Sequence, residues 1–261
     1  MGIFKIFVCD RQGKASPAKA AFNLLVAAAA IALFFYYSLA KVGIRLDFGF
    51  LSLFQVRLRG GFAMTIGLSA ASLGMSLLLG LLSAAGHGSP FLPLRYACDI
   101  YVKFIRGTPL ITQIYLFFYL VGTAWGVESR FWAGAVILSV FEGAYISEII
   151  RGSLLSMPES QLEAARAVGL TRAQTLRHVV LPQLVARTLP ALTGQFASII
   201  KDSSLLSIIA VTELTQSMKE ISATNFKLFE CYLLLGLLYL CLTLPITFFT
   251  KRLERRFRYE N

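Results

Sequence analysis

Six long apolar stretches constrain this chain more than any other feature of its sequence. Each is about 20 residues long, which is the length an α-helix needs to cross the hydrocarbon core of a bilayer. They predict membrane spans near Ala20–Ala40, Gly61–Ala85, Tyr101–Val121, Phe131–Ile150, Thr188–Ala210 and Phe229–Thr250. No series of short alternating segments suggests an outer-membrane barrel. The predicted fold class is therefore all-α, a polytopic helical membrane protein.

The distribution of charge predicts the orientation of these spans. Of the 261 residues, 56% are hydrophobic and only 15% charged, whereas soluble domains carry about 25% charged residues. Of the 25 Lys and Arg residues, 17 lie on the side of both termini, 7 on the other side, and Lys201 within a span. The positive-inside rule then places both termini and the loop 151–187 in the cytoplasm. The net charge of +11 thus follows from membrane orientation and needs no nucleic acid as a partner.

The four cations between residues 41 and 59 lie on the predicted extracytoplasmic side, against the positive-inside rule, and only snorkelling at the span ends accounts for them.

The sequence also predicts how the chain is divided into segments. The segments are a cytoplasmic N-terminal tail (1–19), an extra transmembrane helix (20–40), an extracytoplasmic segment (41–60), a permeation domain (61–250) with the cytoplasmic loop 151–187, and a basic cytoplasmic tail (251–261).

The first span has a second interpretation, because a basic start followed by an apolar core also resembles a cleaved signal peptide. Its apolar stretch is longer than usual, and Tyr36, Tyr37 and Lys41 make a poor cleavage site. These features favour a retained span. In either case the topology of the remaining five spans is unchanged.

The cysteines and histidines predict no metal site or bound cofactor. The four cysteines, at positions 9, 98, 231 and 241, form no CxxC pair and lie at no ligand spacing from a histidine. His87 and His178 are too few and too far apart to hold a metal. The expected role of the cysteines is that of small buried or idle thiols.

The charged segment between the fourth and fifth spans predicts a helical hairpin. Ser156 as N-cap, Pro158 in the first turn and Glu159 as the capping-box partner predict a first helix that Gly169 ends. Thr171 with Gln174 predicts a second helix, which runs to a break at Leu181-Pro182.

The hairpin surface has the composition of a docking site. Its small residues are Ala164, Ala165 and Ala167, and its polar rim is Glu163, Arg166 and Arg172. The apolar knobs are Leu162, Val168 and Leu170. An apolar centre with a charged edge is typical of an interface. A hairpin that only packs beneath its own helices is the alternative.

Ionisable residues inside the predicted spans are candidates for the substrate path, because a charge at a helix centre is costly. Glu142 lies near the middle of its span, and Tyr145 shares its helix face at i+3. A carboxylate there suits an ammonium or a basic side chain, although a purely interhelical hydrogen bond is the alternative. Glu148 and Arg151 predict a local ion pair, and Lys201-Asp202 predicts an interrupted or cavity-lining helix.

The block EAARAVGL…VVLPQ, from Glu163 to Gln183, resembles the EAA loop of permease subunits of bacterial ATP-binding cassette importers. More specifically, the chain resembles the polar amino-acid uptake branch of that family from about Gly60 to Asn261. Four more stretches carry the resemblance in order: RGTPLITQ, AYISEIIRG, SMPESQLEAA and IIKDSSLLSIIAVTELT. The first predicted span lies outside the five-helix core of the family.

The resemblance implies roles that the residues alone do not establish. The ATPase-coupling surface would comprise Glu163, Ala164, Ala165, Gly169 and Leu170, and the KD[ST]SL pattern would place Lys201, Asp202, Ser203 and Ser204 near the path. It implies an inner-membrane transport subunit rather than an enzyme. Its partners would be an ATPase dimer, a second permease chain and an extracytoplasmic amino-acid-binding protein. ATP and Mg would bind the ATPase, because no GxxxxGK[ST] motif occurs here.

Two other functions remain as alternatives from the sequence. A secondary transporter driven by an ion gradient usually has an internal inverted repeat, and none is visible. A membrane scaffold could use the hairpin only to recruit a cytosolic protein. The five family stretches favour the importer permease over both.

Overall fold

The structure, a computed structural model, describes residues 16–256, and the side chains of 251 and 253–256 are not described. It divides into two units, Met1–Phe48 and Gly49–Asn261. Parts of both predicted tails, and Cys9, lie outside the described residues. Within the described range every regular element is helical, and the predicted all-α class is confirmed.

The first unit contains α1 (Pro17–Val42). Ser16 caps this helix by accepting a hydrogen bond from the backbone N–H of Lys19, and Pro17 occupies its first turn. Gly43 ends it in the left-handed conformation, with φ +75°. None of its residues is buried, so its long apolar side chains are available to lipid or to another helix.

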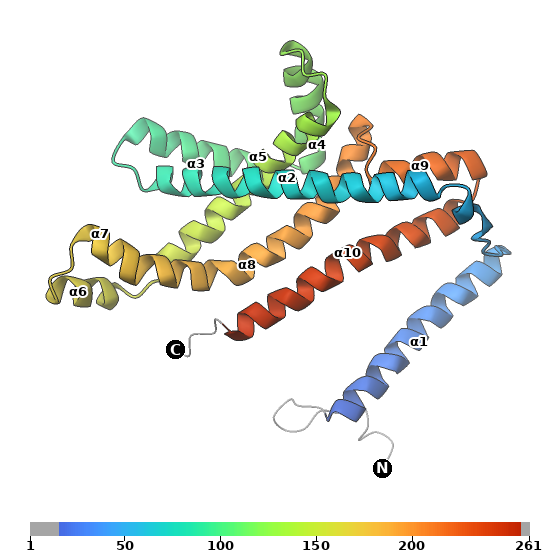
Figure 1. The fold of residues 1–261 in the computed structure, drawn as a ribbon, viewed down its shortest axis with the longest axis horizontal. Helices are drawn as coiled ribbons and strands as arrows, with labels where there is room; N and C mark the ends of the chain where they lie inside the picture. The colour runs from blue at the N-terminus through green and yellow to red at the C-terminus, as the bar shows by residue number, and fades with distance from the viewer. Residues whose placement is uncertain (1–15, 257–261) are drawn as a thin grey trace. The chain divides into compact units, whose positions relative to one another are not determined.

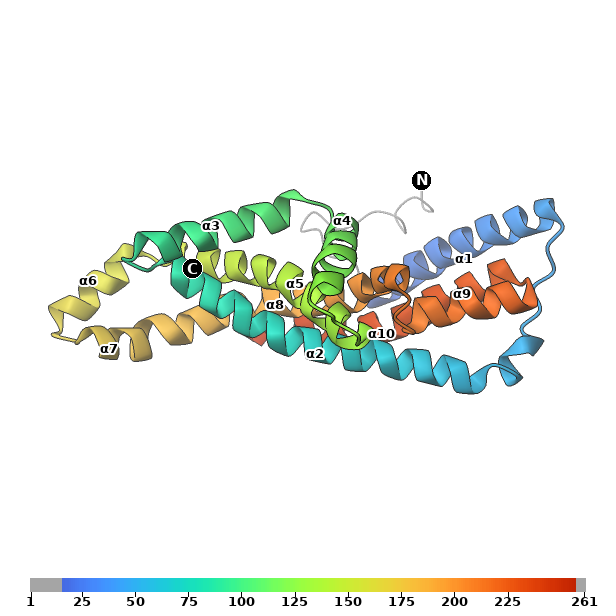
Figure 2. The ribbon, with the colours of Figure 1, turned by 90° about the horizontal axis from the view of Figure 1, so that it is seen from above.

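The second unit holds the remaining helices (Figure 1). The α6–α7 hairpin lies at one end of this unit and α9 at the other in both views (Figures 1 and 2). The elements are η2 (Gly49–Ser52), α2 (Gln55–His87), α3 (Leu92–Gly107), α4 (Leu110–Tyr115), η3 (Leu116–Gly122), α5 (Arg130–Leu155), α6 (Glu159–Ala167), α7 (Arg172–Thr175), η4 (Leu176–Val180), α8 (Leu181–Asp202), η5 (Ser203–Ile209), α9 (Leu214–Asn225) and α10 (Leu228–Arg256).

Among the described residues, four helices are long and apolar enough to cross a membrane: α1, α2, α5 and most of α10. The bent pair of α3 with α4–η3 makes a fifth if it is one span. The chain is therefore a multi-pass membrane protein. The helix α8 carries too many polar residues to qualify by length and composition, although it covers much of the predicted span Thr188–Ala210.

The pair of α2 and α5 forms the centre of the second unit and is held by small residues. Ser72 Oγ donates to the carbonyl of Ala135 at 3.3 Å, and Ser139 Oγ donates back to the carbonyl of Ser72 at 3.2 Å. A further bond joins Ser147 to Ser83 at 3.0 Å. Small residues and hydroxyl bonds replace the hydrophobic effect between helices in lipid, where water supplies no driving force.

Gly80 lies where these two helices pack closely. A Cβ built on Gly80 would lie 2.5 Å from Ile146 Cγ2 and 3.2 Å from the carbonyl oxygen of Gly143. We therefore expect Gly80→Ala to lower the free energy of unfolding by about 1–3 kcal/mol, the usual cost of overpacking. The measurement is thermal unfolding of the purified chain in detergent.

Gly74 provides the matched control on the same helix, because a Cβ there would meet no atom within 4 Å in the part of the chain that the structure describes. Gly74→Ala should leave the melting temperature unchanged or raise it slightly, since alanine favours the helix. An equal loss in both variants would contradict the close-packing role of Gly80.

The predicted span Tyr101–Val121 is not one continuous helix, although the bent pair remains one span if both parts cross together. The helix axis turns by 113° between α3 and the α4–η3 segment, and Figure 1 shows α4 pointing away from α2 and α3. The break falls at Thr108-Pro109, since Pro109 cannot donate to the preceding turn. Gln113 satisfies the carbonyls freed there, donating to Ile105 O at 2.8 Å and Thr108 O at 3.2 Å.

The sequence predicted two helix interruptions in the last part of the chain, and the structure contains one of them. The predicted break at Leu181-Pro182 was wrong, because η4 continues directly into α8 with Pro182 in the first turn of α8. Pro182 is tolerated there because a π-helical turn precedes it and a first-turn residue needs no internal donor. The predicted interruption at Lys201-Asp202 is confirmed, since α8 ends at Asp202 and continues as the 3₁₀ helix η5.

Candidate functional site

The first candidate site is a polar cluster buried among the membrane-spanning helices. Glu142 lies on α5 and is 0% exposed. Gln195 of α8 donates a hydrogen bond from Nε2 to Glu142 Oε2, so the predicted interhelical bond exists. The carboxyl group of Asp202, the last residue of α8, lies beside that of Glu142. Two neighbouring carboxyl groups in a medium of low dielectric do not both ionise readily, and either a shared proton or a cation such as an ammonium between them relieves the repulsion.

Glu142 Oε1 makes no hydrogen bond within the described part of the chain. A buried acceptor without a donor is costly, so such atoms commonly belong to functional sites. The cluster therefore combines a negative charge with an acceptor that a positively charged ligand group would satisfy.

The other predicted path residues are arranged differently. Tyr145 was expected to share the face of Glu142, but its ring lies 5.5 Å from the guanidinium carbon of Arg106 in a cleft between α3 and α5. Lys201 is exposed, and Ser204 is half-buried. Ser203 is buried and donates to the carbonyl of Ile200 at 2.7 Å, so it stabilises the end of α8. Of the predicted set, only Glu142 and Asp202 come together.

The second candidate site is the α6–α7 hairpin. Gly169 adopts φ +77° after α6, and the N–H of Leu170 donates to the carbonyl of Ala165 at 3.0 Å. Only glycine adopts this left-handed conformation without strain. The predicted capping box of the second helix is confirmed, since Thr171 Oγ1 accepts from Gln174 N and Gln174 Oε1 accepts from Thr171 N. The bend between the two helices is thus defined by local chemistry.

The predicted start of the first helix was wrong. Ser156 is the C-cap of α5, and its Oγ donates to the carbonyl of Ser153 at 2.9 Å. The helix α6 begins at Glu159 after Pro158, without a side-chain cap. Arg187 of α8 explains the difference, because its Nη1 donates to Ser156 O at 2.7 Å and to Ser156 Oγ at 2.9 Å. Ser156 therefore ties the base of the hairpin to α8.

The hairpin exposes only part of the predicted coupling surface. Glu163, Ala164 and Gly169 are exposed, whereas Ala165 is 4% exposed and Leu170 half-buried. Ala165 thus lies inside the hairpin and cannot be touched by a partner. Val168 is 74% exposed and supplies an apolar centre beside the bend. A second hydrogen bond, which Gln183 Nε2 donates to Gln161 Oε1, holds α6 against α8.

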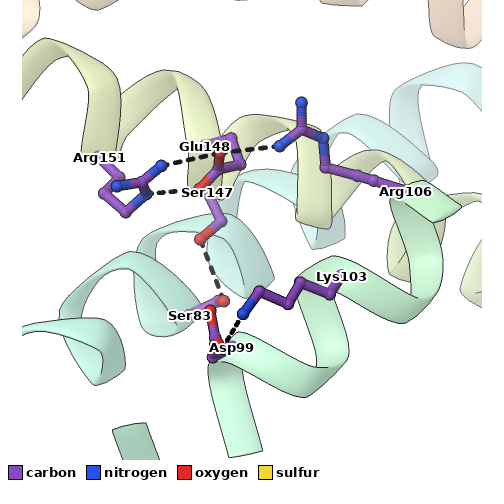
Figure 3. A network of polar contacts seen from close by, with 7 residues as sticks. All are labelled: Ser83, Asp99, Lys103, Arg106, Ser147, Glu148 and Arg151. Atoms are coloured by element: carbon purple, nitrogen blue, oxygen red, sulfur yellow. Dashed lines mark hydrogen bonds and ion pairs between the residues drawn. The ribbon is translucent and has the colours of Figure 1, made fainter. Parts of the chain in front are cut away.

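An ion-pair network joins α3 to the end of α5 (Figure 3). Glu148 Oε1 accepts from Arg151 Nε at 2.5 Å, which confirms the predicted local pair. Glu148 Oε2 also accepts from Arg106 Nη1 at 2.8 Å, a contact across 42 residues that the sequence did not predict. Lys103 pairs with Asp99 at 2.6 Å on the same side of α3.

A further buried acid, Glu213, caps α9 and was missed by sequence reasoning. It accepts from the backbone of Thr215 at 2.8 Å and of Gln216 at 2.7 Å, and Tyr239 Oη donates to it at 2.9 Å. Burial raises the pKa of the Glu213 carboxyl above its usual value, and these donors oppose that rise. The only sequence signal for this role was an acidic residue just before a helical stretch, because such a residue is a common N-cap.

The family comparison covers more than half of the chain. Residues 76–259, which begin within α2 and include α3 to α10, match the family described as binding-protein-dependent transport system inner membrane component. The chain belongs to this family. The permease is therefore a transport component of the inner membrane and not an enzyme. In the described part of the permease no cluster of His, Cys, Asp or Glu could hold a metal ion.

Proteins with similar sequences are named as permeases of amino-acid transport systems. The permease is 34% identical over 196 residues to a probable glutamine ABC transporter permease protein of Bacillus subtilis (strain 168), covering 75% of this chain and 91% of that one. It is 37% identical over 200 residues to an L-cystine transport system permease protein of the same organism, covering 76% and 86%. It is 36% identical over 201 residues to the glutamine transport system permease protein of Escherichia coli (strain K12), covering 76% and 91%.

The fold of the permease is similar to solved importer structures. A crystal structure of an amino acid ABC transporter with histidines superposes with a TM-score of 0.76 and 31% identity, covering 82% of this chain and 100% of that one. A MetNI methionine ABC transporter in an inward-facing conformation gives 0.68 at 20% identity, covering 79% and 98%, which establishes the shared fold alone.

Proposed function

We propose that this permease forms the translocation path for a polar or basic amino acid in an ATP-driven importer, and that the α6–α7 hairpin couples it to a separate ATPase. The observation that carries the proposal is the buried Glu142 cluster in a chain of this family. A carboxylate within the spans is costly unless it is paired, and a transported ammonium would pair it at each cycle.

The chemistry of the cluster suggests the substrate class. Glu142 Oε1 is available as an acceptor, and the Asp202 carboxyl beside it adds negative charge. An α-ammonium, a guanidinium or an imidazolium fits this pair, whereas an acidic side chain would be repelled. The relatives whose names specify glutamine, cystine or arginine, and the similar structure with histidines, agree with a polar or basic amino acid.

The coupling step rests on the hairpin. We assign Glu163, Ala164, Val168 and Gly169 as the exposed surface that contacts the ATPase, and Ala165 and Leu170 as its internal support. Because Arg187 and Gln183 tie the hairpin to α8, a movement of the hairpin would shift α8 and hence Gln195 and Asp202.

The same proposal assigns the partners and the orientation. Two ATPase chains would bind ATP and Mg, a second permease chain would complete the path, and an extracytoplasmic binding protein would deliver substrate. Both termini and the hairpin would lie in the cytoplasm, as the charge distribution predicts. ATP binding would close the ATPase pair and turn the path outward, and hydrolysis would reset it.

Co-reconstitution tests this function. The permease, its candidate ATPase and its candidate binding protein are placed in liposomes, and ATP hydrolysis is measured with each of a panel of amino acids. We expect stimulation by polar or basic amino acids and accumulation of the same amino acids in the liposomes. Uptake that requires an ion gradient but no ATPase would support a secondary transporter instead. ATPase binding without any stimulation would support a scaffold.

A further inference from the structure

A cleft of about 1090 Å³ lies between the end of α2, α3 and the end of α5, away from the Glu142 cluster. It is close to the base of the hairpin, since Leu154 and Leu155 line it and the hairpin follows directly. Charged side chains gather in it, and Figure 3 shows part of this group. They are Arg95, Asp99, Lys103, Arg106, Glu148 and Arg151.

The charges in the cleft do not balance. The single carboxylate of Glu148 accepts hydrogen bonds from both Arg106 and Arg151, which leaves one positive charge in excess. The Asp99–Lys103 pair is neutral. Because fields from nearby charges add inside a cleft with low-dielectric walls, the excess charge favours an anion at this place.

Two more groups lack partners within the described part of the chain. Arg95 is exposed and lines the cleft, and its guanidinium makes no hydrogen bond or ion pair within the described residues, so it adds a further positive charge to the cleft. His87 Nε2 is buried and also without a hydrogen-bond partner in that range. A buried polar atom without a partner commonly indicates a missing ligand, ion or water.

The surroundings of the cleft suit a lipid as the source of that anion. Leu92, Tyr96 and Leu155 line the cleft and are 56%, 61% and 72% exposed. Exposed apolar side chains beside a group of cations are what an acyl chain attached to an anionic headgroup requires. Basic pockets between membrane helices on the cytoplasmic side are known binding places for such headgroups.

We propose that this cleft binds a phosphate group through Arg95, His87 and the guanidinium groups of Arg106 and Arg151. The phosphate belongs to an anionic lipid headgroup or to a free phosphate, and both share the same recognition chemistry. The placement in the cytoplasmic leaflet rests on the proposed orientation, but the binding itself does not. A bound headgroup would join α3 to the end of α5, from which the hairpin extends.

Calorimetric titration of the full-length chain in detergent tests this binding. The probes are dioctanoyl phosphatidylglycerol, dioctanoyl phosphatidylcholine and inorganic phosphate, each titrated into wild type, Arg95→Gln and Arg177→Gln. Arg95→Gln should weaken binding of the anionic probe about tenfold, the size expected for one charge-assisted hydrogen bond. Arg177 is an exposed arginine of η4 that does not line the cleft, so Arg177→Gln should bind as wild type does.

The three probes separate the sources of the phosphate. Binding of phosphatidylglycerol without binding of inorganic phosphate identifies a lipid headgroup. Binding of inorganic phosphate that competes with the lipid shows that a free phosphate is sufficient. If neither anionic probe binds, if phosphatidylcholine binds as tightly as phosphatidylglycerol, or if both variants weaken binding equally, the proposal is overturned. The experiment contains no ATPase or amino acid, so its failure is distinct from failure of the proposed transport function.

Discussion

Gly169→Asp is expected to reduce amino-acid-stimulated ATP hydrolysis by the reconstituted importer about tenfold or more. Gly169 is exposed at the hairpin bend with φ +77°, and a Cβ there would meet no atom of the described residues within 4 Å. The added side chain therefore meets no clash among the described residues, although it strains the backbone by about 1 kcal/mol, and its carboxylate would project into the interface with the ATPase. An unpaired charge forced into such an interface costs more than about 1.4 kcal/mol, which corresponds to tenfold weaker association.

Gly126→Asp is the matched control for this experiment. Gly126 also has a positive φ, +62°, and a Cβ there would likewise meet none of the described atoms within 4 Å. It lies between η3 and α5, outside the hairpin. Both substitutions introduce the same charge and similar backbone strain, about 1 kcal/mol. Equal losses of activity in the two variants would mean that strain or charge alone matters. Full activity of Gly169→Asp would exclude the hairpin bend as a contact with the ATPase.

Glu142→Gln is expected to reduce amino-acid uptake into proteoliposomes about 30-fold or more while the protein stays folded. The glutamine side chain has the same shape, and its carbonyl oxygen still accepts the hydrogen bond from Gln195. What the variant loses is the ability to carry a negative charge. A hydrogen bond to a charged group contributes about 2 kcal/mol, which corresponds to about 30-fold in rate if the transported ammonium binds Glu142.

Ser139→Ala, about one turn earlier on α5, is the control for a purely structural effect. Ser139 is 1% exposed and bonds to backbone carbonyls, so its loss should affect stability rather than uptake per folded molecule. Melting temperature and uptake are measured for both variants. If Glu142→Gln transports at the wild-type rate, Glu142 is only a partner of Gln195 and the substrate path lies elsewhere.

Many local features of this fold could be predicted from the sequence because they depend on residues within one or two turns of each other. Helical spans follow from apolar length, the Thr171–Gln174 capping box from spacing, and the Glu148–Arg151 pair from i,i+3 geometry. The left-handed bend at Gly169 is equally local, since glycine favours it whatever lies around it.

The errors arose where a distant segment competes for a local group. Ser156 looked like a helix start, but Arg187, 31 residues away, binds both its oxygens and fixes it as the end of α5. The contact of Arg106 of α3 with the ring of Tyr145 is likewise long-range, and the sequence did not predict it. Ala165 was expected on the docking surface, and here packing within the hairpin itself, rather than a distant segment, leaves it 4% exposed.

The candidate site shows the same difference between local features and long-range contacts. The sequence by itself determined that this is an all-α membrane protein with a costly acid, Glu142, in its fourth span and a capped hairpin after that span, because apolar length, burial cost and capping are local properties. Only the tertiary structure decided that Gln195, 53 residues from Glu142, would pair with it and that Asp202 would lie beside it. Such contacts depend on which faces of α5 and α8 meet, and packing over the whole second unit, rather than any local pattern, selects those faces.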